Sequence, residues 1–315
     1  MFHMMNEARL GVGHQAFMHA STAYLYALKY ARDRIQGRSL ENFANHEAPS
    51  VAIIEHPDVR RMLLDMKSYV EGMRSFTHYT AACFDWAKIS DTEEEREKYN
   101  GMAEILTPIL KTYNSVEGFN VCVEAMQLYG GAGYTKDYPI EQLVRDCKIA
   151  SIYEGTDGIQ AMDLLARKLP MKEGQVFMAL IQEMQSITAK AKEIEGLKEL
   201  AAKQDEAINK LAETAMALGK TAMSAKFKTG FAHSVPFLYM MGDVIMGWFL
   251  LWRAVVASEK MEGAKKKDVA FYEGQLKNAE YFIQTIIPVT LGKMESINGF
   301  CSASIDISDE AFGEK

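Results

Sequence analysis

Apolar residues recur every third or fourth position along most of the chain, and this spacing most constrains how it can fold. Behind Pro57 the repeat consists of Val59, Met62, Leu63, Met66, Tyr69, Val70, Met73 and Phe76. Such spacing gathers apolar side chains on one face of an α-helix, whereas a half-buried strand needs strict alternation. Only seven of the 315 residues are proline, and runs typical of strands are scarce. We therefore expect an all-α fold in which helices pack on helices.

Helix boundaries follow from the apolar repeat and from residues that start or stop helices. We expect a long helix over residues 6–34 and others that begin at Pro57 and near Asp91. Pro108 should kink the helix that begins near Asp91, and Gly130-Gly131 should end it. The remaining helices are expected over residues 140–147, 173–194, 197–227, 235–262 and 267–292. A change to charged amphipathic helices after residue 170 predicts two helical domains, 1–170 and 171–315.

Charge and cysteine spacing narrow the classes of function. The net charge is −7, and the lysine cluster at residues 265–267 is too short for a nucleic-acid footprint. The cysteines show no Cys-x-x-Cys spacing, so no structural metal site is expected. We interpret Cys83, Cys122, Cys147 and Cys301 as buried thiols of a protein in a reducing compartment, the cytoplasm.

The most apolar stretch, residues 235–257, raises the question of a membrane span. Asp243 lies near its centre and Arg253 near its end, and no uncharged run approaches the roughly 18 residues that a span requires. The stretch therefore predicts a buried helix rather than membrane insertion. The first four residues lack a basic segment before an apolar run, so no signal peptide is expected.

Glycines and a carboxylate that follow the helix from Asp91 form the segment that could carry chemistry. Gly130, Gly131 and Gly133 exceed the single glycine that a helix stop needs, and their backbone can approach a ligand closely. Glu154 lies in Tyr-Glu-Gly-Thr, just before another expected helix. One interpretation is a catalytic carboxylate held between rigid helices. The other is an acidic residue stabilised by the helix dipole, and the residue pattern alone leaves both open.

The run from Gln127 to Gln160 resembles the C-terminal signature of the acyl-CoA dehydrogenase family. Its matching pieces, in order, are a helix, Gly-Gly-Ala-Gly-Tyr, Tyr-Pro, Arg-Asp and Tyr-Glu-Gly-Thr. Residues 6–9 and 30–37 are similar to the first helix of that domain and its end. The later half resembles the additional C-terminal region of the branch that includes 3-methylmercaptopropionyl-CoA dehydrogenase. The resemblance thus implies the family's C-terminal helical bundle followed by a second helical bundle.

The resemblance also implies roles for individual residues. Glu154 matches the base that removes the substrate's α-proton, and its backbone N–H is implied to polarise the thioester carbonyl. The implied FAD contacts are Thr156 and, toward the FAD of a neighbouring subunit, Arg34, Gln127, Gly130 and Gly131. The implied substrate contacts are Arg9, Tyr153 and Gly155. Asn6 stands where the family usually has an aspartate, and Gly158 where many members have a polar adenine contact.

A second placement of the base comes from the isovaleryl-type branch of the family. There the base lies on the first helix, immediately before the arginine, and that position is Ala8 here. Glu7 is one residue away, about 100° around the helix, so we favour Glu154. The apolar residues at 149–152 predict a water-excluded pocket, which would raise the pKa of the Glu154 carboxyl.

The activity implied by the resemblance is FAD-dependent α,β-dehydrogenation of an acyl-CoA substrate, either short-chain or 3-methylmercaptopropionyl-CoA. Glu154 would take the α-proton, FAD N5 would take the β-hydride, and electrons would pass to an electron-transfer flavoprotein. Residues 34 and 127–131 imply a homodimer or a larger homo-oligomer. The family's N-terminal helical and middle β-domains have no counterpart in these residues. The alternative is therefore a non-catalytic helical assembly module that keeps the family's dimerisation surface.

Overall fold

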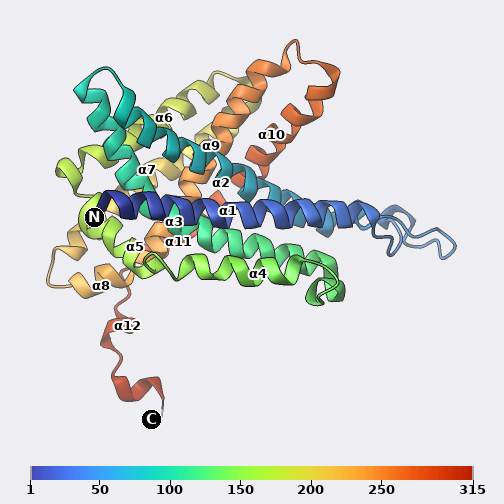
Figure 1. The fold of residues 1–315 in the computed structure, drawn as a ribbon, viewed down its shortest axis with the longest axis horizontal. Helices are drawn as coiled ribbons and strands as arrows, with labels where there is room; N and C mark the ends of the chain where they lie inside the picture. The colour runs from blue at the N-terminus through green and yellow to red at the C-terminus, as the bar shows by residue number, and fades with distance from the viewer. Residues whose placement is uncertain (1, 314–315) are drawn as a thin grey trace.

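The computed structural model describes residues 2–313, and almost all regular structure in that range is helical (Figure 1). The first group comprises α1 (Phe2–Asp33), α2 (Pro57–Ile89), α3 (Glu93–Tyr129), α4 (Ile140–Lys148) and α5 (Asp157–Asp163). The second comprises α6 (Gln175–Lys192), α7 (Lys198–Ala222), α8 (Phe227–Ala232), α9 (Ser234–Met261), α10 (Lys266–Thr285), α11 (Ile287–Asn298) and α12 (Ala303–Asp306). Within residues 2–313 no strand forms, and a single isolated bridge joins Ile35 to Ala52. The all-α prediction is confirmed.

Small residues allow α1 and α3 to pack closely. The buried face of α1 is rich in alanine, with Ala16, Ala20, Ala23, Ala27 and Ala31 all 0% exposed. On α3, a Cβ atom added at Gly118 would come within 2.8 Å of the Ala16 carbonyl oxygen. Because Gly118 has no side chain, the backbones of the two helices can approach this closely. The α1–α3 pair has the most extensive contact between described helices, and it forms the scaffold of the first group.

The start and end of α3 show how local residues set helix boundaries. The helix begins at Glu93, close to the predicted start near Asp91. Thr92 caps it, because the Thr92 hydroxyl accepts a hydrogen bond from the Glu95 backbone N–H at 3.2 Å. It continues through Pro108 as one assigned helix. It ends where predicted, at Gly130, whose φ of 61° is accessible to glycine without steric strain.

The helix predicted over residues 267–292 is instead two helices, α10 and α11. They separate at Ile286, and Pro288 occupies the first turn of α11. A proline cannot donate the hydrogen bond that a helix interior requires, and its ring clashes with the preceding turn, which explains the break. The cysteine prediction is also corrected at one position. Three cysteines are buried, but Cys301 lies in the irregular segment after α11 and is exposed.

Helix α9 contacts both groups of helices. It packs against α2 and α3 of the first group and against α6, α7, α10 and α11 of the second. Among the described helices only α9 is long and apolar enough to cross a membrane. Its most apolar 18-residue stretch has a mean hydropathy of 1.5 and is 83% buried inside the protein. Trp248 is fully buried and stacks with Trp252. The apolar composition of α9 is therefore accounted for by core packing.

A buried carboxylate on α9 joins the two groups by hydrogen bonds. Asp243 is 2% exposed. It accepts hydrogen bonds from the Tyr113 hydroxyl at 2.7 Å, the Thr290 hydroxyl at 2.9 Å and the Lys293 ammonium at 3.1 Å. One continuous hydrophobic core spans both groups. The division into two domains near residue 170 stays a prediction.

Candidate functional site

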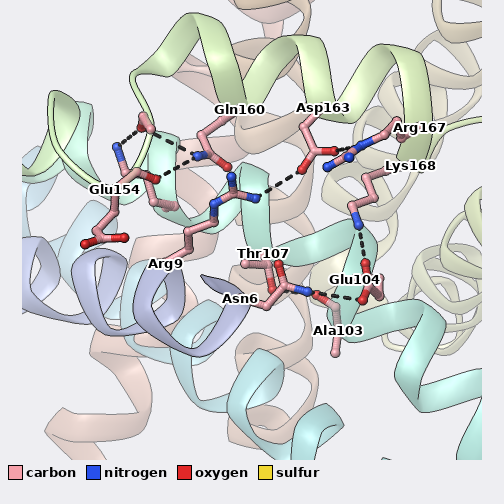
Figure 2. Close-up of polar contacts among 12 residues, drawn as sticks. Asn6, Arg9, Ala103, Glu104, Thr107, Glu154, Gln160, Asp163, Arg167 and Lys168 are labelled. Atoms are coloured by element: carbon pink, nitrogen blue, oxygen red, sulfur yellow. Dashed lines mark hydrogen bonds and ion pairs between the residues drawn. The ribbon is translucent and has the colours of Figure 1, made fainter. Parts of the chain in front are cut away.

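Glu154 lies in an irregular turn between a short 3-10 segment, Ile149–Ser151, and α5 (Figure 2). The φ angle is 54° at Glu154 and 93° at Gly155, so two consecutive residues lie in the left-handed region. Glycine adopts this region without steric strain, whereas a residue with a Cβ atom is disfavoured there. The conformation of Glu154 therefore depends on support from surrounding groups.

Two buried side chains supply that support by donating hydrogen bonds to the carbonyl groups of the turn. Lys111 Nζ on α3 donates to the Gly155 carbonyl oxygen at 2.6 Å. Gln160 Nε2 on α5 donates to the Glu154 carbonyl oxygen at 3.2 Å (Figure 2). Both side chains belong to residues that are 0% exposed. A Cβ atom at position 155 would lie 2.6 Å from Gln160 Nε2, so this close approach requires glycine.

Burial shifts the proton affinities of charged groups next to the turn. It lowers the pKa of Lys111 to about 8, with Arg9 adding to the decrease and Asp157 and Glu154 opposing it. Burial also raises the pKa of Asp157, and a hydrogen bond from the Tyr239 hydroxyl at 3.1 Å opposes that increase. The charge of Lys111, which holds the turn, is therefore sensitive to pH near neutrality.

Glu154, whose carboxylate is the predicted base, is an exposed residue. Its apolar neighbours Ile149, Ile152 and Ile159 are 45%, 52% and 49% exposed. The predicted water-excluded pocket is therefore not formed by the described residues. The chain supplies exposed apolar side chains next to the carboxylate, and a second surface would be needed to remove water from them.

Arg9, predicted to contact substrate, is buried beside the turn and is already paired. Its Nη1 atom lies 3.2 Å from Asp163 Oδ2 on α5, and both side chains are 5% exposed. One helical turn earlier, Asn6 Nδ2 donates to Glu104 Oε1 at 3.1 Å (Figure 2). Arg9 and Asn6 thus attach the start of α1 to α5 and α3. A direct contact between Arg9 and substrate stays a prediction.

The remaining residues predicted near the base have different surroundings. The Tyr153 hydroxyl donates a hydrogen bond to Gln15 Oε1 on α1. Thr156 immediately precedes α5 and is exposed, and its side chain forms no capping hydrogen bond. Glu7, the alternative base, is exposed on α1 and lies 3.9 Å from Lys88 Nζ. Glu7 therefore has none of the buried support that surrounds the Glu154 turn.

The residues predicted to reach a neighbouring subunit's FAD lie together, at the opposite end of the α1–α3 pair from Glu154. Tyr30 near the end of α1 stacks on Tyr129 at the end of α3, with ring centroids 4.0 Å apart. This contact brings the end of α1, which Arg34 directly follows, next to the end of α3, which contains Gln127 and is followed by Gly130 and Gly131. Figure 1 shows α1 and α3 running side by side. The helix from Arg9 to its end at Asp33 measures roughly 36 Å at 1.5 Å per residue. The structure thus separates the predicted site residues into two groups.

Sequence reasoning missed Lys111 and Gln160. Gln160 closes the run that resembles the family signature, but no motif indicated what its side chain binds. Lys111 carried one signal, a lysine between the apolar residues Ile109 and Leu110 and the aromatic Tyr113. A lysine in an apolar stripe predicts burial, and buried lysines need a partner. Among the described residues, no group of three or more His, Cys, Asp or Glu side chains is arranged to hold a metal ion.

A family model described as "Acyl-CoA dehydrogenase, C-terminal domain" matches residues 1–169. A second, described as "Acetyl-CoA dehydrogenase C-terminal like", matches residues 180–308. The chain belongs to the acyl-CoA dehydrogenase family.

Individual relatives cover nearly the whole chain. The chain is 38% identical to 3-methylmercaptopropionyl-CoA dehydrogenase from Ruegeria pomeroyi, over 91% of the chain and 48% of that protein. It is 34% identical to a broad-specificity linear acyl-CoA dehydrogenase from Mycobacterium tuberculosis, over 99% of the chain and 52% of that protein. It is also 34% identical to a butyryl-CoA dehydrogenase from Syntrophomonas wolfei, over 99% and 50%. The chain therefore spans about half the length of these relatives.

Solved structures show the same fold. A Caenorhabditis elegans ACDH-11 structure in complex with C11-CoA matches with a TM-score of 0.70 and 17% identity, over 88% of this chain and 42% of that one. An acyl-CoA dehydrogenase from Bacillus anthracis, complexed with FAD, matches with a TM-score of 0.67 and 17% identity, over 98% and 51%. At this level of identity the likeness establishes the fold alone.

Proposed function

We propose that this chain is the base-bearing C-terminal part of an FAD-dependent enzyme that dehydrogenates acyl-CoA thioesters at the α,β bond. The observation that carries the proposal is the Glu154 turn. Its backbone is held in a strained conformation by two buried donors, while its carboxylate is left exposed. A turn that needed only to connect two helices would not require this support.

The turn presents two groups to a thioester. The Glu154 carboxylate accepts the α-proton, and the Glu154 backbone N–H donates to the carbonyl oxygen, where negative charge develops. FAD, when bound, accepts the β-hydrogen as a hydride. Exposed Ile152 and Ile159 supply apolar surface for the acyl chain. Covering them would desolvate the carboxylate, which strengthens it as a base.

The residues present fit FAD. Arg34 is exposed, and within residues 2–313 its side chain forms no hydrogen bond or ion pair, so its guanidinium is available for a diphosphate. A Cβ atom added at Gly130 or Gly131 would meet no other atom within 4 Å, so a planar group can approach this backbone. Gln127 presents an exposed amide beside them. Beside Glu154, the Thr156 hydroxyl makes no capping hydrogen bond and is therefore also free to donate to FAD.

A homo-oligomer is part of the proposal. The Arg34 group and the Glu154 group lie far apart along both helices: roughly 36 Å from Arg9 to Asp33 on α1, and roughly 24 Å from Lys111, which binds the Glu154 turn, to Gln127 on α3. Both separations are too large for the same part of one cofactor. In a twofold assembly, the Arg34 group of one subunit can serve the site that contains Glu154 of the other. The two groups then make one complete site from two copies of the chain.

Substrate and electron acceptor are proposed from the relatives, and location from the cysteines, which are all free. Relatives of this chain are named as dehydrogenases of 3-methylmercaptopropionyl-CoA and butyryl-CoA, which favours a short or thioether acyl chain. A relative that is 30% identical over 50% of the chain is named as a subunit of a caffeyl-CoA reductase–Etf complex. We propose an electron-transfer flavoprotein as the acceptor and the cytoplasm as the location.

The alternative function is a non-catalytic assembly module, which the exposed Glu154 carboxylate and the half-length match keep in consideration. Visible spectroscopy separates the two. The chain is purified alone and with the N-terminal half of the Ruegeria pomeroyi relative, each with added FAD. We expect weak binding alone, and a yellow complex that is bleached by 3-methylmercaptopropionyl-CoA or butyryl-CoA under anaerobic conditions. A complex that forms but stays colourless would support the module.

A further inference from the structure

The feature of the site that remains unexplained is the presence of a fully buried lysine under the turn. Lys111 is 0% exposed, and the group that it binds is a neutral carbonyl of Gly155 rather than a carboxylate. Burying an ammonium costs free energy that a single neutral acceptor does not offset. An apolar side chain of similar length, such as methionine, would fill the same volume without that cost. The position of the hydrogen bond therefore points to a role in the geometry of the turn.

We propose that Lys111 is a positioning residue for the base. Its ammonium holds the peptide between Gly155 and Thr156, while the Gln160 amide holds the peptide between Glu154 and Gly155. Together they set the direction of the Glu154 carboxylate and backbone N–H. The inference rests on the proposed function, because it assigns the turn's conformation to catalysis. Lys111 acts through the backbone and does not itself touch the substrate.

The two donors reach the carbonyl groups of the turn from different helices. Lys111 comes from α3 and reaches the Gly155 carbonyl oxygen at 2.6 Å. Gln160 comes from α5 and lies 3.2 Å from the Glu154 carbonyl oxygen and 3.5 Å from that of Gly155. The carbonyl groups of Glu154 and Gly155 are therefore bound by side chains from two different helices. Loss of either donor would leave a carbonyl group of the strained pair with less support.

The charged groups that act on Lys111 come from α1, α5 and the turn itself. Arg9 faces it from α1, Asp157 from α5 and Glu154 from the turn, while Tyr239 of α9 acts through its hydrogen bond to Asp157. Burial is the largest influence and lowers the pKa of Lys111 to about 8. Below this pH Lys111 is a charged donor. As the pH rises through this value it becomes a neutral amine, which is a weaker donor.

The first experiment uses the unmodified chain, so that folding of a variant is not an issue. Lysine labelled with ¹³C at Cε reports the titration of Lys111 by NMR, and the backbone amides of Glu154 and Gly155 report the turn. We expect Lys111 to titrate near pH 8 and the two amide shifts to change with the same midpoint. Amide shifts that do not follow the lysine would show that its charge does not control the turn, and would overturn the inference.

The second experiment compares variants by hydrogen–deuterium exchange. Lys111→Met should increase amide exchange in residues 153–157 at least about tenfold, because a charge-assisted hydrogen bond is lost. Lys111→Arg keeps a charged donor and should restore part of the protection. The matched control is Lys168→Met, which removes another buried lysine, one that binds Glu104, away from the turn. Equal increases in exchange at residues 153–157 for Lys111→Met and Lys168→Met would refute a specific role for Lys111.

Flavin reduction in the complex with the N-terminal half then connects the turn to catalysis. Lys111→Met should lower the rate of flavin reduction on the order of a hundredfold, through misplacement of the base, with little change in KM. It should also remove any inflection near pH 8 from the rate profile. If the complex with the unmodified chain reduces no flavin, the proposed function fails, while the exchange and titration data still decide whether Lys111 holds the turn. An unchanged reduction rate for Lys111→Met would overturn the inference alone.

Discussion

Arg9 on α1 and Asp163 on α5 form a buried ion pair across 154 positions of sequence, with Nη1 3.2 Å from Oδ2. The pair attaches the first helix of the chain to the helix that follows the Glu154 turn. Asp163 also accepts a hydrogen bond from Arg167 Nε at 2.6 Å, but the Arg167 side chain is 52% exposed. The buried part of the interaction is therefore the contact with Arg9.

The first prediction concerns the stability that this pair contributes. Arg9→Met should lower the free energy of unfolding by about 3 kcal/mol, because it leaves a buried carboxylate without its buried partner. Urea denaturation measures the change. The control is Asp58→Ala, which breaks an exposed pair with Arg61 and should cost less than about 1 kcal/mol. Similar small losses for both variants would contradict the prediction.

The second prediction concerns the contact between the two groups of helices. Asp243→Ala removes the acceptor of the Tyr113 and Thr290 hydroxyls in the core. The Thr290 hydroxyl can still donate to the Ile286 carbonyl oxygen at 3.1 Å. The buried Tyr113 hydroxyl is left unsatisfied, which should cost about 2 kcal/mol of stability. Thermal denaturation should show a lower Tm than for Asp309→Ala, a control at an exposed position near the end of the chain. Equal Tm values would mean that the Asp243 network does not stabilise the packing of the two groups.

The third prediction concerns pH. Burial raises the pKa of Glu117 from its usual value of 4.5 to about 7; nearby Asp243 adds to the increase and an Asn120 hydrogen bond opposes it. Because the folded-state pKa is the higher one, Glu117 contributes stability that is fully present below pH 4.5 and is lost as the pH rises through about 7. Glu117→Gln should therefore raise Tm at pH 8 and have a much smaller effect at pH 5.

The control for this prediction is Glu206→Gln on the exposed face of α7, which should leave Tm nearly unchanged at both pH values. A Glu117→Gln variant that is less stable than the unmodified chain at pH 8 would contradict the prediction. That result would mean that the Glu117 carboxylate is stabilised, rather than destabilised, by its surroundings.

The sequence predicted the fold class and located the turn, because both depend on local patterns. The apolar repeat placed the helices, and the Tyr-Glu-Gly-Thr segment placed Glu154 between two of them. The details of helix boundaries were also local, such as the capping of α3 by Thr92 and the unpredicted break before Pro288. A single hydroxyl or a proline ring decides such boundaries, and a repeat of apolar residues does not register it.

The support of the turn was not predictable, because it depends on contacts between distant parts of the chain. Lys111 and Gly155 are 44 positions apart, and no spacing rule relates them. The exposure of Glu154 was wrongly predicted for a different reason. The apolar residues before it predicted a water-excluded pocket, but within residues 2–313 Ile149 and Ile152 remain 45% and 52% exposed. A pattern of apolar residues gives the tendency to be buried, and the partner must come from the rest of the fold or from another polypeptide.

The last prediction tests the base itself. Glu154→Gln keeps the size of the side chain and its turn but removes the basicity of the carboxylate. General-base catalysis contributes about 10²–10⁴-fold, so flavin reduction in the complex with the N-terminal half should fall by at least about a hundredfold. Binding of FAD and of acyl-CoA should be nearly unchanged, because the backbone N–H of residue 154 and the two buried donors remain in place.

Rapid-mixing measurements of flavin bleaching provide the readout, and Glu7→Gln is the matched control. Glu7 is exposed and only 3.9 Å from a lysine ammonium, without buried donors around its backbone, so its substitution should change the bleaching rate far less. Bleaching that survives Glu154→Gln and disappears with Glu7→Gln would move the base to α1. In that case the strained turn would bind the thioester carbonyl without taking the proton, and the Lys111 contact would position the backbone N–H alone.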